Sequence, residues 1–243
     1  MKTVAIVQAR TGSSRLPGKV LEQIEGRSML WRVCRRAGRS VLVDRLVVAT
    51  TTRPADQAIV DECRRLGVPC FRGSETDVLD RYHQAATLHA ADVVVRITAD
   101  CPLIDPEVID LVAGAFFERQ PDYASNSLPR SWPQGLDTEV MTAAALARAA
   151  REATRPHQRE HVTPYIYQHP ELFTLHPVTC GRNLAEYRWT VDMPEDLQFA
   201  RAVYRRFAGD DAFCWRDVED LLAEEPALAD LNRHVRQKDL AEE

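Results

Sequence analysis

Residues 3–19 read T-V-A-I-V-Q-A-R-T-G-S-S-R-L-P-G-K, an apolar run of strand length that passes directly into a basic loop. The run from Thr3 to Gln8 predicts the first strand of the chain. The loop that follows it, residues 8–19, holds two arginines, a lysine, two glycines and three hydroxyl side chains. Glycines let backbone N–H groups approach phosphate oxygens, and arginine and lysine supply positive charge, so this composition suits a polyphosphate.

The loop matches neither of the common phosphate-binding motifs. Val20 follows Lys19 where a Walker loop, G-x-x-x-x-G-K-[ST], requires Ser or Thr, and G-x-G-x-x-G is also absent from the loop. The alternative is a surface loop whose charges are only solvated. Composition alone leaves both interpretations open.

Farther along the chain, apolar runs of strand length alternate with stretches of helical spacing. This alternation is the usual sign of a mostly parallel sheet covered by helices on both faces. Later strands are expected at 46–49, 68–71, 92–98, around Tyr123 and at 187–191. Helices are expected at 29–37, 55–66, 77–89, 108–116, 197–207, 217–222 and 226–235. The sequence therefore predicts a single α/β domain over residues 1–243.

Residues 125–181 interrupt this alternation. They carry six prolines and four of the seven histidines, with only short helical or strand patterns between them. We expect an inserted subdomain that lies over the sheet.

Composition excludes several classes of protein. The 243 residues include 31 Lys plus Arg against 36 Asp plus Glu, a net charge of −5, so no overall positive field favours a nucleic-acid partner. The six cysteines form no C-x-x-C pair, which indicates reduced thiols and neither a zinc ribbon nor a disulfide framework. The first apolar run is too short for a signal peptide or a membrane span. We expect a cytoplasmic protein with no membrane segment.

Two later strands are expected to end in a carboxylate. Asp100 lies in T-A-D-C-P-L-I-D-P, and Asp192 lies in T-V-D-M-P-E-D. Ligands of open α/β sheets bind beyond the carboxyl ends of the strands, and Mg²⁺ on a nucleotide takes one or two carboxylates together with phosphate oxygens. Helix capping is the alternative role for both aspartates. Two such ends opposite one basic loop favour a metal site.

These segments resemble the cytidylyltransferases that make CMP-activated acidic sugars, such as 3-deoxy-manno-octulosonate and acylneuraminate cytidylyltransferases. The resemblance rests first on A-R-T-G-S-S-R-L-P-G-K and on the two aspartate segments, in this order along the chain. Four further strings are most similar to the subfamily of spore coat polysaccharide biosynthesis protein F. They are F-R-G-S-E-T-D-V-L-D-R-Y, Y-A-S-N-S, G-L-D-T-E-V and R-E-H-V-T-P-Y-I-Y.

The resemblance implies a Rossmann-like nucleotidyltransferase fold, with residues 125–181 as an inserted subdomain for acceptor binding and dimerisation. It implies a homodimer that uses CTP as co-substrate and Mg²⁺ as cofactor, with Asp100 and Asp192 as the metal ligands. The nucleotide is expected to contact the following residues, which the resemblance assigns to the first loop and to a second segment: Ala9, Arg10, Gly12, Ser13, Arg15, Lys19, Arg72, Gly73 and Ser74.

The acceptor is expected to be an acidic sugar or a related small anion. Several basic side chains in or next to the inserted region are candidates for holding a carboxylate or phosphate, namely Arg130, His157, Arg159, His161 and Arg182. The acceptor-binding candidates in the motifs of this region are Asn126, Gly135, Asp137, Glu139 and His161. A glycine turn entering a short strand is the alternative interpretation of residues 135–139.

The expected reaction is attack of an acceptor oxygen on the α-phosphorus of CTP, with release of pyrophosphate. Such a reaction depends on positioning and on charge neutralisation. Arg10, Arg15, Lys19 and Asp100 are the candidate catalytic residues: the three cations neutralise the departing charge, and a Mg²⁺ ion on Asp100 and Asp192 bridges the α-phosphate and the acceptor hydroxyl.

Two other functions compete with this hypothesis. A nucleotide-sugar-dependent glycosyltransferase has a similar sheet, but such enzymes usually present a D-x-D pair, which this sequence lacks. A non-catalytic nucleotide-binding protein could retain the same pocket. The sequence also departs from the acidic-sugar enzymes, which usually have Pro at the position of Gln8 and other residues at that of Cys101.

Overall fold

The computed structural model describes residues 1–236, so the last seven residues of the predicted domain lie outside the described part of the chain. A seven-stranded sheet forms its centre, in the order β5-β4-β1-β6-β8-β7-β9. These strands are β1 (Thr3–Gln8), β4 (Arg45–Thr51), β5 (Cys70–Gly73), β6 (Val93–Thr98), β7 (Tyr123–Ser125), β8 (Glu139–Thr142) and β9 (Leu175–Pro177). The predicted α/β class, with a mostly parallel sheet, is confirmed.

The four strands that the N-terminal half contributes are parallel. β1 pairs with β4 on one side and with β6 on the other, and β5 extends the sheet beyond β4. β8 runs antiparallel to both β6 and β7, and β9 pairs with β7 in parallel. Residues 125–181 therefore add strands to the central sheet itself, in addition to three helices.

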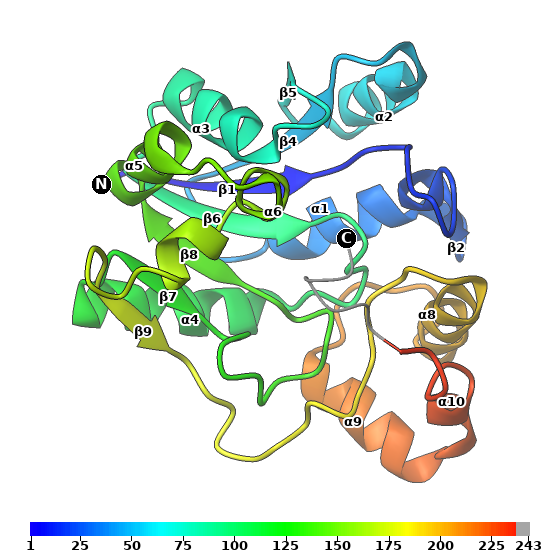
Figure 1. Ribbon diagram of the computed structural model, residues 1–243. Coiled ribbons are helices and arrows are strands. Elements are labelled where there is room, and N and C mark those ends of the chain that lie inside the picture. The colour runs from blue at the N-terminus through cyan, green and yellow to red at the C-terminus, as the bar shows by residue number, and fades with distance from the viewer. Residues whose placement is uncertain (237–243) are drawn as a thin grey trace.

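Helices cover both faces of this sheet (Figure 1). One apolar cluster joins one face of the strands to helices that include α1 (Met29–Ala37), α2 (Gln57–Leu66) and α4 (Pro106–Arg119). A second cluster joins the opposite face to α3 (Val78–Leu88) and α5 (Ala143–Glu152), followed by the short α6 (Pro156–His161) and α7 (Pro164–Tyr167). Val4 and Val94 belong to the second cluster and Ala5 and Val95 to the first, because successive strand residues face opposite sides.

A third apolar cluster lies beyond the strand ends. It contains α8 (Pro194–Arg206), α9 (Trp215–Glu224) and α10 (Ala227–Asp230). Figure 1 shows these helices grouped at the end of the molecule toward which β1 points. A small hairpin, β2 (Gln23–Ile24) with β3 (Arg27–Ser28), lies at the same end. The short turns η1 (Lys19–Leu21) and η2 (Pro54–Asp56) complete the elements of the described residues.

The predicted strand at 187–191 is wrong. Only Arg188 forms an isolated bridge, to Gln134, and the segment is otherwise an extended connection. Trp189 and Val191 are buried in the third cluster and belong to neither of the two clusters that cover the faces of the sheet. The apolar residues that suggested a strand are therefore explained by packing against the C-terminal helices.

The boundaries of other predicted elements shift as well, including the following two. The strand predicted at 68–71 begins at Cys70, because Val68 donates its N–H to Cys63 O and closes the end of α2. The last predicted helix, 226–235, is helical only over α10. Within residues 1–236, no helix is both long enough and apolar enough to cross a lipid bilayer.

Candidate active site

Two adjoining cavities open beyond the carboxyl ends of β1 and β6. The first cavity, of about 200 Å³, lies against the loop that follows β1, and the second cavity, of about 710 Å³, extends from it over β6 and β8. Both cavities are lined by Gln8, Arg15, Thr98, Asp100, His161 and Asp192. This shared boundary is where a ligand in one cavity would meet a ligand in the other.

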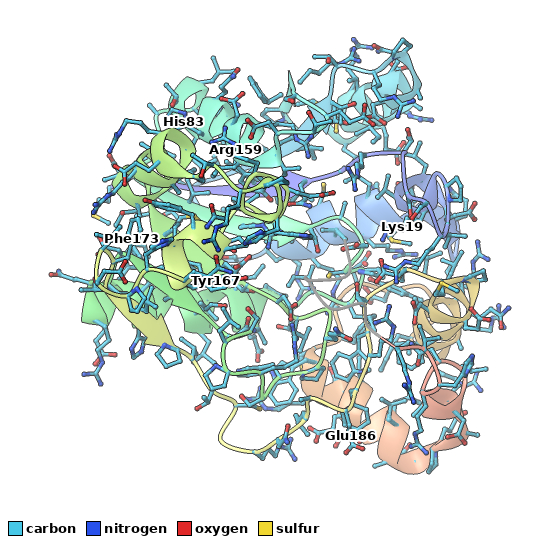
Figure 2. The ribbon with its side chains drawn as sticks, viewed as in Figure 1. Lys19, His83, Arg159, Tyr167, Phe173 and Glu186 are labelled. Carbon is cyan, nitrogen blue, oxygen red and sulfur yellow. The ribbon has the colours of Figure 1, made fainter. Side chains whose placement is uncertain are left out.

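Lys19 lies between two aspartates at the shared boundary. Its Nζ donates hydrogen bonds to Asp100 Oδ2, Asp192 Oδ1 and the carbonyl of Val191, each at 2.8 Å. Figure 2 shows Lys19 between the N-terminal part of the chain and the C-terminal helices. Burial alone would lower the pKa of Lys19, but the two carboxylates outweigh burial and raise that pKa.

Asp100 is ionised in this arrangement. Its burial would raise the pKa of the carboxyl group, but the charge and hydrogen bond of Lys19, with a hydrogen bond from Thr98, lower that pKa to about 2. Such a carboxylate is a permanent negative charge and a weak base at neutral pH.

Asp192 meets two further cations. Arg15 Nη2 is 3.1 Å from Asp192 Oδ1, and Arg188 Nη2 donates to Asp192 Oδ2 at 2.9 Å. Arg188 also pairs with the buried Asp196, whose carboxylate accepts the N–H groups of Asp192 and Met193. The sequence analysis missed Arg188, although its i, i+4 spacing to Asp192 was visible.

The connection that carries Asp192 is tied to the sheet by its backbone. Val191 donates its N–H to Asp100 O at 2.8 Å, and Trp189 donates its N–H to Gln134 O at 2.6 Å. These bonds bring two distant aspartates onto one lysine without a shared pair of strands.

The loop after β1 is held from both ends. Gly18 has a φ of 73°, a left-handed conformation that glycine adopts freely, and its N–H donates to Thr11 O at 2.9 Å. Thr11 donates both its N–H and its hydroxyl to Asp56 Oδ1, at 2.8 and 2.6 Å. Burial would raise the pKa of Asp56, but hydrogen bonds from Thr11 and Thr51 outweigh burial and lower that pKa.

Most residues predicted in this loop reach the first cavity. Ala9, Arg10, Ser13, Arg15 and Lys19 line it. Gly12 does not line it, and a Cβ at Gly12 would instead lie 3.7 Å from Arg53 Nη1 and 3.8 Å from Glu75 Oε1. Arg10 faces Glu160 of α6 across the cavity, with Nη2 3.6 Å from Oε1.

The segment Arg72, Gly73 and Ser74 does not line either cavity. The Arg72 guanidinium donates to Thr51 O and Arg53 O, and the Ser74 hydroxyl accepts the N–H of Asp77 at the start of α3. Through these hydrogen bonds, the polar groups of Arg72 and Ser74 connect β4, β5 and α3. The structure thus gives this segment a supporting position behind the cavity.

Arg81 of α3 lines the first cavity, whereas Arg72, Gly73 and Ser74 do not. Its side chain is buried, Nη1 donates to Ser74 O at 2.6 Å, and burial lowers the pKa of the guanidinium. Its Nε has no hydrogen-bond partner among the described residues. A signal was present in the sequence, because Arg81 stands between the core positions Leu79 and Tyr82.

The second cavity contains two arginine–carboxylate pairs. Arg130 and Asp137 form a bidentate pair, with bonds of 2.6 and 2.7 Å. Arg96 pairs with Glu139, whose Oε1 also accepts the hydroxyls of Tyr123 and Thr163, at 2.5 and 2.7 Å. Of the predicted acceptor-binding residues, Asp137, Glu139 and His161 therefore line this cavity.

Asn126 and Gly135 support the cavity without lining it. The Asn126 side chain donates to Leu136 O and accepts the Thr138 N–H, both at 2.8 Å, so both of its ends are used by backbone. Gly135 has a φ of 107°, and a Cβ there would lie 2.6 Å from the carbonyl carbon of Trp189. Glycine is required at this position by the close approach of two backbone segments.

Three of the basic residues predicted near the acceptor lie elsewhere. Arg159 pairs with Asp77, Arg182 pairs with Glu219 on an exposed surface, and His157 contacts Gln168. Of that predicted set, only Arg130 and His161 line the second cavity.

The Asp100 and Asp192 side chains suit a metal ion whose other ligands come from the nucleotide and from water. Both direct an oxygen at one point, where the Lys19 ammonium lies. Among the described residues, no group of three or more Asp, Glu, His or Cys side chains is placed to hold a metal ion. Two carboxylates fit Mg²⁺ when phosphate oxygens and water supply the other ligands.

Cys101 is excluded as a reactive thiolate. Its side chain is buried, and burial raises its pKa well above the ordinary value. A thiol with a raised pKa is a poor nucleophile at neutral pH.

Comparison with known proteins identifies the family of the chain. The family model described as cytidylyltransferase matches residues 4–214. The chain belongs to the cytidylyltransferase family. It is therefore a CTP-dependent nucleotidyltransferase, and the predicted family resemblance is confirmed.

This cytidylyltransferase has relatives that align over most of its length. The protein MJ1063 of Methanocaldococcus jannaschii is 39% identical over 244 residues, covering 100% of this chain and 99% of that protein. The spore coat polysaccharide biosynthesis protein SpsF of Bacillus subtilis is 34% identical, covering 83% of this chain and 85% of SpsF.

Solved structures share the fold of this cytidylyltransferase. A cytidylyltransferase from Leptospira borgpetersenii superposes with a TM-score of 0.90 at 31% identity, covering 94% of this chain and 97% of that one. A CMP:2-keto-3-deoxy-manno-octonic acid synthetase, solved with CTP, superposes with a TM-score of 0.65 at 19% identity, covering 85% of this chain and 99% of that one. The second likeness supports the fold alone.

Proposed function

We propose that this cytidylyltransferase transfers CMP from CTP to an acidic sugar or a related anionic acceptor, with Mg²⁺ and with release of pyrophosphate. The observation that carries the proposal is the position of Lys19, held by Asp100 and Asp192 at the boundary of two cavities. Two substrates need two adjoining compartments, and a phosphoryl transfer needs fixed charges where they meet.

The first cavity is the proposed CTP site. Arg10, Arg15 and Lys19 line it and provide three positive charges for a triphosphate. Because the loop is tied to Asp56 and Gly18 closes it back on Thr11, these cations are held in place before the nucleotide binds. Prepositioned charges avoid the cost of reorganisation during the reaction.

Asp100 and Asp192 are the proposed ligands of Mg²⁺. The ion, when bound with the nucleotide, would neutralise phosphate charge and lower the pKa of the attacking hydroxyl. The protein's own contribution is to hold the two carboxylates on one side of the cavity, with Arg188 fixing the second oxygen of Asp192.

In the proposed reaction a hydroxyl oxygen of the acceptor forms a bond to the α-phosphorus of CTP. The bond from that phosphorus to the bridging oxygen breaks, pyrophosphate leaves with the electron pair, and the hydroxyl proton passes to solvent water. Arg10, Arg15 and Lys19 stabilise the charge that develops on the leaving group. The pKa of Asp100, about 2, makes it unsuited to remove the proton.

The second cavity is the proposed acceptor site. Its arginines Arg96 and Arg130 are the candidates for holding an acid group, while Asp137 accepts hydroxyls. A 3-deoxy-manno-octulosonate cytidylyltransferase of Chlorobium phaeovibrioides is 41% identical over 121 residues, covering 50% of this chain and 48% of that enzyme, which supports an acidic-sugar acceptor. The likeness to SpsF supports a role in surface polysaccharide synthesis.

We further propose that residues 125–181 select the acceptor and contribute to a homodimer, and that the reaction takes place in the cytoplasm, where CTP is available. Light scattering of the purified protein tests the dimer, and a mass equal to one chain would contradict it.

The proposed activity is tested by incubating the protein with each of the four ribonucleoside triphosphates, MgCl₂ and a panel of sugar acids and phosphorylated small acids. Pyrophosphate release that requires CTP, Mg²⁺ and an acceptor is the expected result. In a parallel incubation that also contains a UDP-sugar, its consumption would support a glycosyltransferase instead, and CTP binding without pyrophosphate release would support a non-catalytic protein.

The metal ligands are tested with Asp100→Asn. This variant is expected to fold and to lose Mg²⁺-dependent turnover, because the neutral amide is a weaker ligand for a hard cation. Circular dichroism checks folding. Retained Mg²⁺-dependent pyrophosphate release would refute the role of Asp100.

A further inference from the structure

Gln8 lies at the shared boundary of the two cavities, and its carboxamide oxygen forms no hydrogen bond with the described residues. It is the last residue of β1, and it lines both cavities. Its backbone is paired within the sheet, where its carbonyl accepts the N–H of Ala99 at 3.0 Å. Its Oε1 is buried and has no hydrogen-bond partner among the described residues.

A buried side-chain oxygen without a hydrogen-bond partner is unusual at the end of a central strand. The other residues of β1 are fully buried, and buried polar groups in proteins are almost always hydrogen-bonded. Neighbouring polar side chains are occupied: Asp100 and Asp192 bind Lys19, and Arg15 faces Asp192. Among residues 1–236, Gln8 Oε1 forms no hydrogen bond, so a partner for this oxygen is missing from the described part of the chain.

The chemistry of the amide restricts what those partners are. A carboxamide has an acceptor end, Oε1, and a donor end, Nε2. Phosphoryl oxygens only accept hydrogen bonds, whereas a hydroxyl also donates. At the boundary, Arg15 only donates, and Asp100 and Asp192 only accept. Gln8 is therefore suited to contact a phosphoryl oxygen and a hydroxyl at the same time.

The position of Gln8 agrees with this pair of partners. Gln8 is one of the side chains that line both cavities, so it lies where the proposed nucleotide cavity and the proposed acceptor cavity meet. A half-turn about the terminal bond of the side chain exchanges Oε1 and Nε2, and this torsion has a broad profile. Either end can therefore reach the cavity side, and binding of substrates selects the orientation.

We propose that the Gln8 carboxamide orients the attacking hydroxyl on the α-phosphoryl group, with Nε2 donating to a phosphoryl oxygen and Oε1 accepting from the hydroxyl. This inference rests on the proposed transfer from CTP and adds a residue that contacts both reacting groups. Orientation of a nucleophile changes the rate more than it changes nucleotide affinity.

The test compares Gln8→Met, which keeps the length of the side chain and removes both hydrogen bonds, with Gln8→Glu, which keeps an acceptor and adds negative charge. Gln84→Met, on the exposed face of α3, is the matched control. Water, glycerol and 3-deoxy-manno-octulosonate serve as nucleophile probes. Pyrophosphate release from CTP with MgCl₂ gives the rate, and calorimetry with α,β-methylene CTP gives the affinity.

Gln8→Met is expected to lower the rate at saturating CTP by about 100-fold, while the dissociation constant of the analogue changes by less than about threefold. Gln8→Glu is expected to weaken analogue binding by about tenfold as well, because a carboxylate repels the phosphate. Thermal unfolding of both variants should match that of the Gln84→Met control.

Three results would overturn the inference. In the first, Gln8→Met releases pyrophosphate as fast as the wild type with every nucleophile. In the second, its rate and its nucleotide affinity fall by the same factor, which would make Gln8 a binding residue only. In the third, the wild type itself releases no pyrophosphate from CTP, which means that the proposed function has failed and the inference fails with it.

Discussion

Lys19 is the residue on which the charge balance of the site depends. Within the described part of the chain it is the only lysine that lines the first cavity, and it contacts both candidate metal ligands. Removal of its charge with Lys19→Met is expected to lower CTP-dependent pyrophosphate release by roughly 10²- to 10³-fold, as for other prepositioned charges. Steady-state assays measure this effect. Lys19→Arg, which keeps the charge, is the control, and equal activity of Lys19→Met and wild type would contradict the role.

Asp56 gives the loop after β1 a dependence on pH. Its folded-state pKa is lowered, chiefly because hydrogen bonds from Thr11 and Thr51 overcome the effect of burial. The stabilisation is therefore complete above the ordinary carboxyl pKa and is lost as pH falls through that value toward the lowered one. Asp56→Asn is expected to reduce the free energy of unfolding by about 1.5–3 kcal/mol at pH 7.

The same comparison below pH 4 should show a smaller difference between Asp56→Asn and the wild type. Urea unfolding at pH 7, 5, 4 and 3 measures the difference. A gap that stays constant over this range would mean that Asp56 contributes no ionised hydrogen bonds to the folded state.

Single residues were predictable where their chemistry coincides with a strand end. Asp100 follows β6 and Lys19 belongs to the loop after β1, whereas Asp192 was chosen after an expected strand, 187–191, that the structure does not contain. The structure nevertheless brings the three side chains together. Arg81 and Arg188 were missed because each lies within a helix or an apolar segment, and the spacing that marks each of them does not show which cavity or carboxylate the arginine reaches in the fold. Asn126 was predicted to bind the acceptor, but both ends of its amide form hydrogen bonds with the backbone of its own loop.

The extended connection before α8 is the element that completes the site. It packs so closely against Gly135 that a Cβ there would lie 2.6 Å from the carbonyl carbon of Trp189 and 2.7 Å from the N atom of Thr190. Gly135→Ala is expected to lower the free energy of unfolding by about 1–3 kcal/mol and to displace Asp192 from Lys19. Pyrophosphate release should therefore fall even at temperatures where the variant remains folded.

The Gly181→Ala variant is the control that separates the effect of backbone strain from the effect of the close approach at Gly135. Gly181 has a φ of 78°, and a Cβ there would have no atom within 4 Å. This variant is expected to lose some stability and to keep its activity. If both variants lose activity equally, the contact between Gly135 and the connection does not position Asp192.

The parallel strands of the N-terminal half were predictable because buried strands appear as continuous apolar runs, whereas β8 and β9 were not predicted. β1 begins and ends where the sequence predicts, and β6 differs by one residue. The apolar run at 187–191 misled the prediction, because burial against α8 and α9 produces the same pattern as burial in a sheet. A short apolar segment does not reveal which neighbour covers it.

In the whole molecule, the site joins the N-terminal sheet to the third apolar cluster. Lys19 belongs to the first part, and Val191 and Asp192 precede α8, so a ligand that contacts all of them is expected to stabilise both parts. CTP at 100 times its dissociation constant should raise the free energy of unfolding by about 2.7 kcal/mol, which corresponds to roughly 5–10 °C in melting temperature.

Thermal unfolding with MgCl₂ and each of CTP, UTP, ATP and GTP measures this stabilisation. CTP is expected to give the largest shift. An equal shift with all four nucleotides would indicate a site that recognises the phosphates alone, and no shift with CTP would contradict the proposed CTP site.

The sequence by itself determined the α/β class, the loop of cations after β1 and the two aspartates that follow apolar segments. These features depend on local spacing and composition, which neighbouring residues along the chain express directly. Only the tertiary structure decided that Asp100 and Asp192 meet on Lys19, that Arg81 replaces Arg72 at the cavity and that Gln8 Oε1 has no hydrogen-bond partner within residues 1–236. Each of these depends on segments far apart in the chain, and long-range packing determines which of them come into contact.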